Sequence, residues 1–243
     1  RILIAVFADD CGAGFKEAIR AEYLAIRTEY GKLINIDSPG PDTTVPITMM
    51  TGIDVEIDYK SGTVAISQKT NVGKLAQEFK NKVTMNSMPT PASKAKREAF
   101  ENMKKGTESE HVDRIPFLED LGKVGWLAVT TYPELSFYHS VLGSHMQYPT
   151  REAHDALLYV MGYAINFRYA KIVYGGKLRI PPGLSVPPPF FNESYGFYLT
   201  HDSSWGKRPR PQAGHAVFRC NGAIHWSSRC LLYTSDAADD GLS

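Results

Sequence analysis

The sequence predicts a mixed chain of helices and sheets, of the α+β or α/β class, on three observations. An apolar run at residues 2–6 ends directly in acidic and glycine residues, as a strand does when it enters a tight turn. Between residues 116 and 168, apolar side chains recur at the three- and four-residue spacing of helices. Beyond a proline-rich segment at 181–189, short extended runs predict a second group of strands.

Two adjacent carboxylates follow the first strand, in the run Phe7-Ala8-Asp9-Asp10. Like charges held side by side on a turn raise each other's energy unless a cation lies between them. Mg²⁺ takes oxygen ligands and typically uses one or two protein carboxylates together with substrate phosphates. Asp9 and Asp10 therefore predict a metal-dependent phosphoryl-transfer site, although a solvated turn with two surface acids fits the same four residues.

The first part of the chain is expected to continue with a helix, a hairpin and a second helix. Helical spacing of apolar residues predicts a helix over 15–30, and the aperiodic segment 32–51 predicts a loop. Residues 53–68 alternate in polarity on either side of a Lys-Ser-Gly turn, which predicts a β-hairpin. Asn71 is the expected cap of a short helix. The residues expected to face inward from that helix are Val72, Leu75, Ala76 and Phe79.

The middle of the chain predicts a linker followed by helices. Residues 85–106 are polar and basic and contain two prolines, so a linker or an exposed loop is expected there. Three helices are then predicted, over 116–130, over 134–146 just after a proline, and over 150–168. Residues 170–174 are expected to form a strand.

The last part of the chain predicts strands and then an irregular tail. Segments 195–200, 214–220 and 223–226 are expected to form three short strands. The tail 231–243 is small, acidic and aperiodic.

Composition excludes several classes of protein. The formal net charge of +1 carries no global signature of nucleic-acid binding, although basic residues gather at 80–105 and 207–229, where solvated surface and phosphate contact both fit. Three cysteines without metal-ligand spacing predict a reducing compartment and no disulfide framework. No segment is long and apolar enough to span a bilayer and no signal peptide is visible, so no membrane partner is expected. The chain begins at Arg1 inside an apolar strand, as expected of a fragment.

Longer blocks give these patterns a more specific interpretation. The first blocks are Gly52-Ile53-Asp54-Val55-Glu56-Ile57, Ile66-Ser67-Gln68-Lys69, Lys74-Leu75-Ala76-Gln77-Glu78-Phe79 and Thr90-Pro91. The most extended block is Trp126-Leu127-Ala128-Val129-Thr130-Thr131-Tyr132-Pro133-Glu134-Leu135-Ser136-Phe137. The last blocks are Thr200-His201-Asp202-Ser203-Ser204-Trp205-Gly206, 213–218 and 221–228. In these blocks, over most of residues 1–230, the chain resembles the Pol polyproteins of copia-type LTR retrotransposons.

The resemblance implies a division of the chain into parts. Residues 1–82 would form the C-terminal part of a reverse-transcriptase palm, with its β-hairpin, and the start of the thumb. Residues 83–178 would form a basic linker and a helical thumb or connection region, and 190–230 the first strands of a ribonuclease H-like domain. The tail 231–243 resembles translated sequencing-adapter read-through, so its acids are excluded from the site.

The resemblance also implies the chemistry. Asp9 and Asp10 would be catalytic, metal-binding residues of the palm, and Asp202 the first metal-binding carboxylate of ribonuclease H. In the intact enzyme two Mg²⁺ ions would promote transfer of nucleotides from deoxynucleoside triphosphates to a DNA primer on an RNA template, and hydrolysis of RNA in a hybrid. The expected location is intracellular, in the cytoplasm (in a virus-like particle for the intact element) or in the nucleus.

The sequence departs from the family at several places. The return strand at 11–14 is glycine-rich where the family is apolar, so a loosened hairpin is expected. Tyr132 stands where the family has arginine, and the glutamate expected soon after residues 226–228 is missing. The family's other palm aspartate falls before Arg1. We therefore expect the isolated chain to be inactive, with a non-catalytic nucleic-acid-binding remnant or an unrelated soluble α/β protein as the alternatives.

Overall fold

The computed structural model describes residues 3–7, 10–14, 17–33, 47–83, 87–176, 197–203 and 211–230. It begins with strands β1 (Leu3–Phe7) and β2 (Asp10–Gly14), followed by the short 3₁₀ helix η1 (Glu17–Ile19) and helix α1 (Arg20–Leu33). For β1, β2 and the end of α1 only the backbone is described. Helix α1 confirms the helix expected over 15–30, and it continues two residues past the glycine at position 31.

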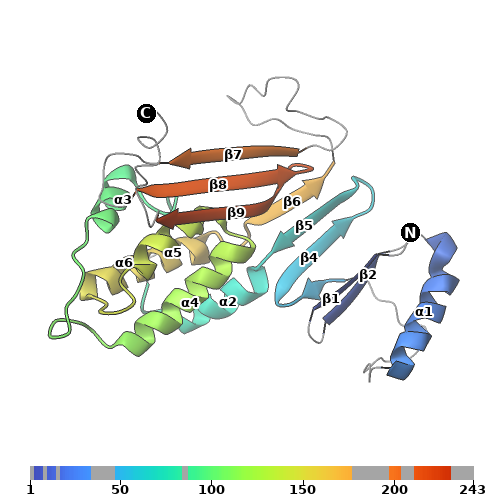
Figure 1. Ribbon diagram of the computed structural model, residues 1–243, viewed down its shortest axis with the longest axis horizontal. Helices are drawn as coiled ribbons and strands as arrows, with labels where there is room; N and C mark the ends of the chain where they lie inside the picture. The colour runs from blue at the N-terminus through green and yellow to red at the C-terminus, as the bar shows by residue number, and fades with distance from the viewer. Residues whose placement is uncertain are drawn as a thin grey trace, which may run out of the picture.

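The described strands form three antiparallel sheets (Figure 1). Strands β1 and β2 pair over five residues each, so the glycine-rich return strand completes its ladder despite the loosening expected from sequence. The second sheet has the order β3-β4-β5-β6, and the third has the order β7-β8-β9. The bounds of these strands are β3 Met49–Met50, β4 Ile53–Asp58, β5 Thr63–Ser67, β6 Lys171–Gly175, β7 Phe197–Ser203, β8 Gln212–Arg219 and β9 Gly222–Cys230. A mixture of helices and antiparallel sheets confirms the α+β class.

One helical core is inserted in the sequence between β5 and β6 of the second sheet and lies beneath the third sheet in space (Figure 1). Its helices are α2 Lys69–Glu78, α3 Lys94–Glu101, α4 Arg114–Thr130, the 3₁₀ helix η2 Pro133–Leu135, α5 Ser136–Gly143 and α6 Arg151–Asn166. The fully buried apolar side chains include Val72, Phe79, Phe117, Val124, Leu127, Leu142, Leu157, Val160 and Met161. This core crosses the boundary expected at residues 82 and 83, because α2 contributes Val72 and Leu75 to it and Phe79, the C-cap of α2, belongs to it as well.

The expected linker at 85–106 is wrong, because residues 94–101 form helix α3. Ser93 begins this helix, and its side chain accepts a hydrogen bond from the backbone N–H of Lys96. Phe100 then enters the core, where it contacts the rings of Tyr138 and Tyr159 edge to face at centroid distances of 6.2 and 6.1 Å. Phe100 is the one large apolar side chain of this helix, and most of its other residues are charged. The apolar spacing that predicts a helix is therefore missing from this segment.

The expected cap at Asn71 is also wrong, because helix α2 begins at Lys69. Asp54 of strand β4 caps it instead, accepting hydrogen bonds from the backbone N–H of Thr70 at 2.9 Å and from the Thr70 hydroxyl at 2.5 Å. A carboxylate at a helix N-terminus satisfies unpaired N–H groups and interacts favourably with the helix dipole. The capping group therefore comes from the neighbouring sheet rather than from the helix's own sequence.

The remaining elements follow the predictions with shifted ends. The helix expected over 134–146 is the 3₁₀ turn η2 followed by α5, with Pro133 in the first turn. The helix expected over 150–168 is α6, with Thr150 as its N-cap. The three late strands are confirmed and extend further than expected. The proline-rich boundary and the tail from residue 231 lie outside the described residues.

The second and third sheets meet at a junction of backbone and side-chain hydrogen bonds. The backbone N–H of Gly175 donates to the carbonyl of Cys220 at 2.7 Å, and Asn221 donates from its amide to the Gly175 carbonyl at 2.9 Å. The Tyr174 hydroxyl donates to the carbonyl of Ala223 at 2.7 Å. The end of β6 is thereby fixed to the turn between β8 and β9.

Candidate functional site

Asp202 lies near the end of β7, directly opposite Gly214 of β8 in the ladder. Because side chains alternate along a strand, Asp202 lies on the same face of the sheet as Thr200 and Tyr198. Trp226 of β9 is on this face too, and it hydrogen-bonds to Ala128 of α4, so the face is turned toward the helices. Asp202 is exposed, and its Oδ1 accepts a hydrogen bond from the Ser203 backbone N–H at 2.8 Å. Among the described residues it forms no ion pair.

As the first metal-binding carboxylate of a ribonuclease H site, Asp202 is expected to end a central strand beside residues 214–220 and to point to an open face. The neighbour is β8 as expected, but β7 is the edge strand of its described sheet. An edge position leaves one side of β7 without a described partner strand. The assignment of Asp202 as a metal ligand stays a prediction.

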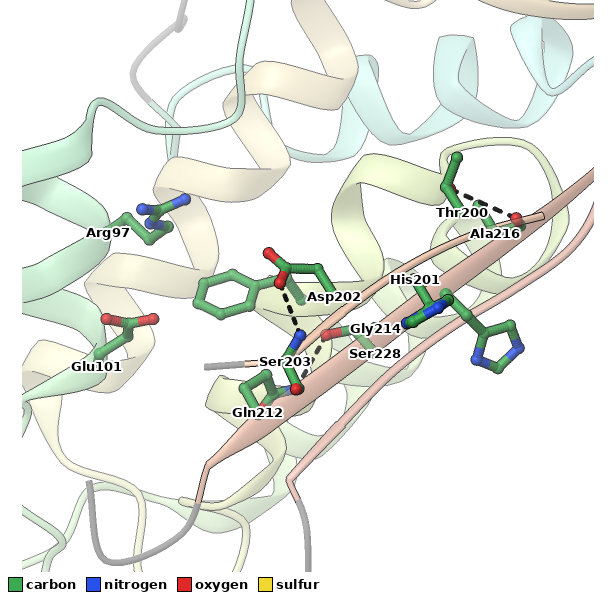
Figure 2. Close-up of a pocket in the computed structure, with 12 residues that line it drawn as sticks. Arg97, Glu101, Thr200, His201, Asp202, Ser203, Gln212, Gly214, Ala216 and Ser228 are labelled. Carbon is green, nitrogen blue, oxygen red and sulfur yellow. Dashed lines mark hydrogen bonds between the residues drawn. The ribbon is translucent and has the colours of Figure 1, made fainter. Parts of the chain in front are cut away.

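A cavity of about 430 Å³ opens in front of Asp202, between the β7-β8-β9 sheet and helices α3 and α5. Figure 2 shows the side chains of Arg97 and Glu101 extending from α3 toward the strand that carries Asp202. Phe137 of α5 forms another part of the wall, and the Arg97 guanidinium lies 6.0 Å from the centre of its ring. The cavity thus combines two carboxylates with a guanidinium, groups that suit a cation and a phosphate respectively.

Gln212 fixes the sheet to the helices at one end of this cavity. Its side-chain amide donates to the Ser140 hydroxyl of α5 at 3.0 Å and to the Ser228 hydroxyl of β9 at 2.9 Å. Ser140 and Ser228 lie on different elements, so the amide bridges them. This bridge fixes β8 and β9 relative to α5, and Asp202 lies on β7, the strand that pairs with β8.

The two other predicted site residues fall at the opposite end of the chain. Asp9 lies outside the described residues, and Asp10 begins β2, where its backbone pairs with Phe7. In Figure 1 the β1–β2 hairpin lies at the end of the molecule remote from α3. The structure therefore does not bring Asp10 and Asp202 together, consistent with their assignment to separate sites.

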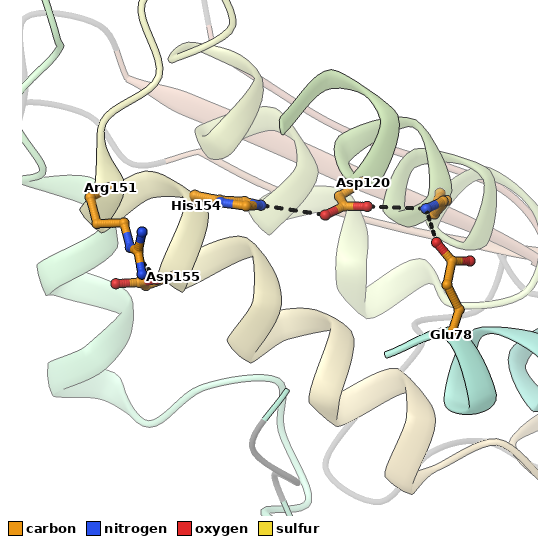
Figure 3. Close-up of polar contacts among 6 residues, drawn as sticks. Glu78, Asp120, Arg151, His154 and Asp155 are labelled. Carbon is orange, nitrogen blue, oxygen red and sulfur yellow. Dashed lines mark hydrogen bonds and ion pairs between the residues drawn. The ribbon is translucent and has the colours of Figure 1, made fainter. Parts of the chain in front are cut away.

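A second polar cluster joins helices α2, α4 and α6 (Figure 3). Lys123 donates from Nζ to Glu78 Oε1 at 2.6 Å and to Asp120 Oδ1 at 3.1 Å, and His154 Nε2 lies 3.4 Å from Asp120 Oδ2. Burial opposes the charge on Lys123, but its hydrogen bonds to Glu78 and Asp120 outweigh burial and raise its pKa. Both oxygens of Asp120 are occupied, so this cluster fastens three helices rather than presenting a free ligand.

Sequence reasoning missed Arg97 and Glu101 as cavity residues. Their spacing of four residues places both on one face of a helix, and that signal was readable, but the segment was expected to be a linker. In the part of the chain that the structure describes, no three His, Cys, Asp or Glu side chains come close enough to hold a metal ion. No described helix combines the length and apolarity needed to cross a bilayer.

Comparisons with protein-family models, with curated proteins and with solved structures found no match for this chain. The resemblance to copia-type Pol polyproteins remains a prediction from the sequence blocks. A functional proposal rests on those blocks and on the geometry around Asp202.

Proposed function

We propose that this chain is a segment of a copia-type reverse transcriptase and ribonuclease H, and that its Asp202 cavity is part of a Mg²⁺-dependent site for an RNA–DNA hybrid. The observation that carries the proposal is the place of Asp202. It lies in the block that resembles the start of the family's ribonuclease H domain, on the first strand of a three-stranded antiparallel meander, and it borders a cavity. In the intact protein, Asp9 and Asp10 would serve a separate polymerase site.

The groups around the cavity fit part of a magnesium site. Mg²⁺ binds through one or two protein carboxylates and completes its shell with water and phosphate oxygens. Asp202 and Glu101 offer carboxylates from two elements, and Arg97 offers a cation for a phosphate of the same ligand. When bound, the metal would activate water against the RNA strand and stabilise negative charge on the phosphate. The protein's own residues would position the hybrid backbone and hold the ion.

The block at 126–137, which carries the most extended resemblance to the family, lies in the helical core. This block runs through the end of α4, the turn η2 and the start of α5, which together pack beneath the third sheet. Tyr132 is fully buried there, and its hydroxyl donates to the Phe167 carbonyl at 3.2 Å. Tyr132 can therefore replace the family's arginine as a core residue. A neutral phenol can be buried at this position, whereas a guanidinium would need an anionic partner.

Hybrid binding in the presence and absence of Mg²⁺ tests the Asp202 site. We expect the full chain to bind an RNA–DNA hybrid more tightly with Mg²⁺ than with EDTA, at fixed ionic strength, and Asp202→Asn to remove this difference. Asp155→Asn is a suitable control, because Asp155 is an exposed acid of α6 that pairs with Arg151 at 3.4 Å and does not border the Asp202 cavity. Equal binding with and without Mg²⁺, in the wild type and in Asp202→Asn alike, would contradict the proposed site.

Polymerase activity is tested separately by primer extension on an RNA template. We expect no incorporation by the isolated chain, since two-metal catalysis requires several carboxylates arranged around the ions. Incorporation that Asp9→Asn abolishes would show that this chain is itself a polymerase. The genomic sequence on both sides of the coding region tests the family assignment, which predicts an upstream palm aspartate and downstream ribonuclease H carboxylates in the same reading frame.

A non-catalytic nucleic-acid-binding remnant is the second candidate, favoured by the basic surface of α3. Lys94, Lys96 and Arg97 lie within one helix, and Lys96 contacts the Tyr159 ring at 3.7 Å from its centre. Binding through phosphates alone weakens with salt, by a factor that grows with the number of contacts, and does not depend on the metal. A steep salt dependence that is unchanged in Asp202→Asn would favour this candidate over the first.

A further inference from the structure

By strand alternation, a row of histidines lies on the face of the β7-β8-β9 sheet opposite to Asp202, although His201 and His215 also border the Asp202 cavity. His201 of β7 pairs directly with His215 of β8, and side chains directly opposite each other in an antiparallel ladder share a face. His225 of β9 pairs with Val217, two residues along β8 from His215, so it lies on that face as well. His201 and His225 are exposed and His215 is half-buried, so solvent reaches the row.

Two of these imidazoles bring ring nitrogens into direct contact. His215 Nε2 and His225 Nδ1 are 3.0 Å apart, and the rings stack with centroids 5.0 Å apart and planes inclined by 15°. Two nitrogens at this distance share one proton, with one ring as donor, or they share another cation.

The distance between the two ring nitrogens matches that of two imidazole ligands bound to one transition-metal ion. Imidazole nitrogens bind Zn²⁺ at roughly 2.0–2.1 Å. Two such bonds meeting at an angle of about 90–110° place their nitrogens roughly 2.9–3.4 Å apart, a range that includes the observed separation. The pair is therefore spaced for chelation with little movement of either strand.

We propose that His215 and His225 form a two-imidazole binding site for a divalent transition-metal ion of the Zn²⁺, Cu²⁺ and Ni²⁺ class. Neutral imidazole suits these ions, whereas Mg²⁺ prefers oxygen ligands, so this site differs in chemistry from the Asp202 cavity on the other face. Water molecules complete the shell of the ion. On the same face, Arg229 donates from Nε to the hydroxyl of Ser227, the ladder partner of His215, at 3.0 Å. The proposal stands independently of the assignment to a reverse transcriptase.

Calorimetric titration of the full chain with Zn²⁺ and Ni²⁺ tests the site. The titrations use a background in which Cys11, Cys220 and Cys230 are replaced by serine, because thiolates would compete for these ions. We expect one ion to bind per chain, and His215→Ala or His225→Ala to weaken binding by more than about tenfold, since even outer-shell partners of metal ligands cost roughly 10–100-fold. The control His111→Ala removes an exposed histidine remote from the sheet and is expected to leave the affinity unchanged.

A second measurement tests the site without histidine substitutions, so it does not require that the His215 and His225 variants fold. In the cysteine-free chain with all its histidines retained, the imidazole ¹⁵N resonances of His215 and His225 are expected to shift together when one equivalent of Zn²⁺ is added. The proposal is overturned if these resonances stay in place while ions bind elsewhere, if no binding is measured, or if folded His215→Ala and His225→Ala chains bind as tightly as the parent.

Discussion

Trp226 of β9 donates its indole N–H to the backbone carbonyl of Ala128 in α4, across 98 residues of sequence and a distance of 2.5 Å. The acceptor belongs to the last turn of the helix, where carbonyls lack a partner within the helix. One hydrogen bond thus ties the third sheet to the helical core and satisfies a helix terminus. It also orients the face of the sheet that carries Asp202 toward the helices.

Replacing Trp226 by phenylalanine is expected to lower the free energy of unfolding by about 1 kcal/mol, because the Ala128 carbonyl loses the indole donor and keeps the Ser136 hydroxyl at 3.3 Å. Urea denaturation measures the change. Trp126→Phe is the matched control, since Trp126 is 41% exposed and its loss is expected to change stability by less than about 0.5 kcal/mol. Equal effects of the two substitutions would mean that the indole contact contributes nothing.

Helix α3 is expected to be part of the cooperative fold rather than a linker. Phe100 is 5% exposed, so Phe100→Ala removes a buried ring and is expected to cost about 3–5 kcal/mol of unfolding free energy. Ile115→Ala serves as the control, because Ile115 is 66% exposed and precedes the buried part of α4. Thermal unfolding followed by circular dichroism compares them. A Phe100→Ala chain as stable as the parent would restore the interpretation of residues 85–106 as a linker.

Gly125 of α4 is expected to be needed for the close approach of His139 on α5. A β-carbon at position 125 would lie 2.6 Å from His139 Nε2. Gly125→Ala should therefore destabilise the parent by roughly 1–2 kcal/mol through overpacking, although alanine has the higher helix propensity. In a His139→Ala background the same change should stabilise by about 1 kcal/mol, because only propensity remains.

A double-mutant cycle measures this coupling between Gly125 and His139. Gly122→Ala on the same helix is the control, since a β-carbon there meets no atom within 4 Å, and it should stabilise both backgrounds alike. Additive effects of Gly125→Ala and His139→Ala would refute the proposed contact.

Stability is expected to fall as the pH rises above about 10, the ordinary pKa of tyrosine. Burial raises the pKa of Tyr132, so the folded chain keeps a proton that the unfolded chain releases in this range. Because the folded state then binds more protons, the free energy of unfolding decreases with pH, by up to about 1.4 kcal/mol per pH unit for each such group. Below pH 10 both states hold the proton and this contribution is constant.

Tyr132→Phe is expected to make that alkaline slope shallower by up to one proton, and to cost about 1 kcal/mol at neutral pH through the lost hydrogen bond to Phe167. Trp126→Phe should leave the slope as it was, because it alters a side chain that carries no titratable group. Urea titrations between pH 8 and 11.5 (range set by the ordinary tyrosine pKa of about 10) give both quantities. An unchanged slope in Tyr132→Phe would exclude this residue as the group that titrates.

Local patterns in the sequence were sufficient for most individual elements. Helices α4 and α6 follow from apolar spacing, and Thr150 caps α6 as its position before the periodic run suggests. The hairpin β4–β5 follows from alternation around a short polar turn. These features depend on residues within a few positions of each other, so they can be inferred without knowing which segments meet.

The contacts that define the candidate sites could not be inferred in this way. Helix α3 was missed because only Phe100 faces the core, and α2 receives its cap from Asp54, a residue of the preceding hairpin. The cavity before Asp202 gains Arg97 and Glu101 from a segment about a hundred residues away in sequence. The contact between His215 and His225 depends on strand register and was not predicted.

The sequence by itself therefore determined a mixed class of helices and sheets, the order of most elements and the choice of Asp9, Asp10 and Asp202 as candidate metal ligands. Only the tertiary structure decided what surrounds Asp202, which face carries the histidine pair, and how Trp226 joins the sheet to the helices. The reason is physical. Periodicity records which side of an element is buried, whereas a site depends on which elements pack against each other, and that is decided by the burial of the whole core.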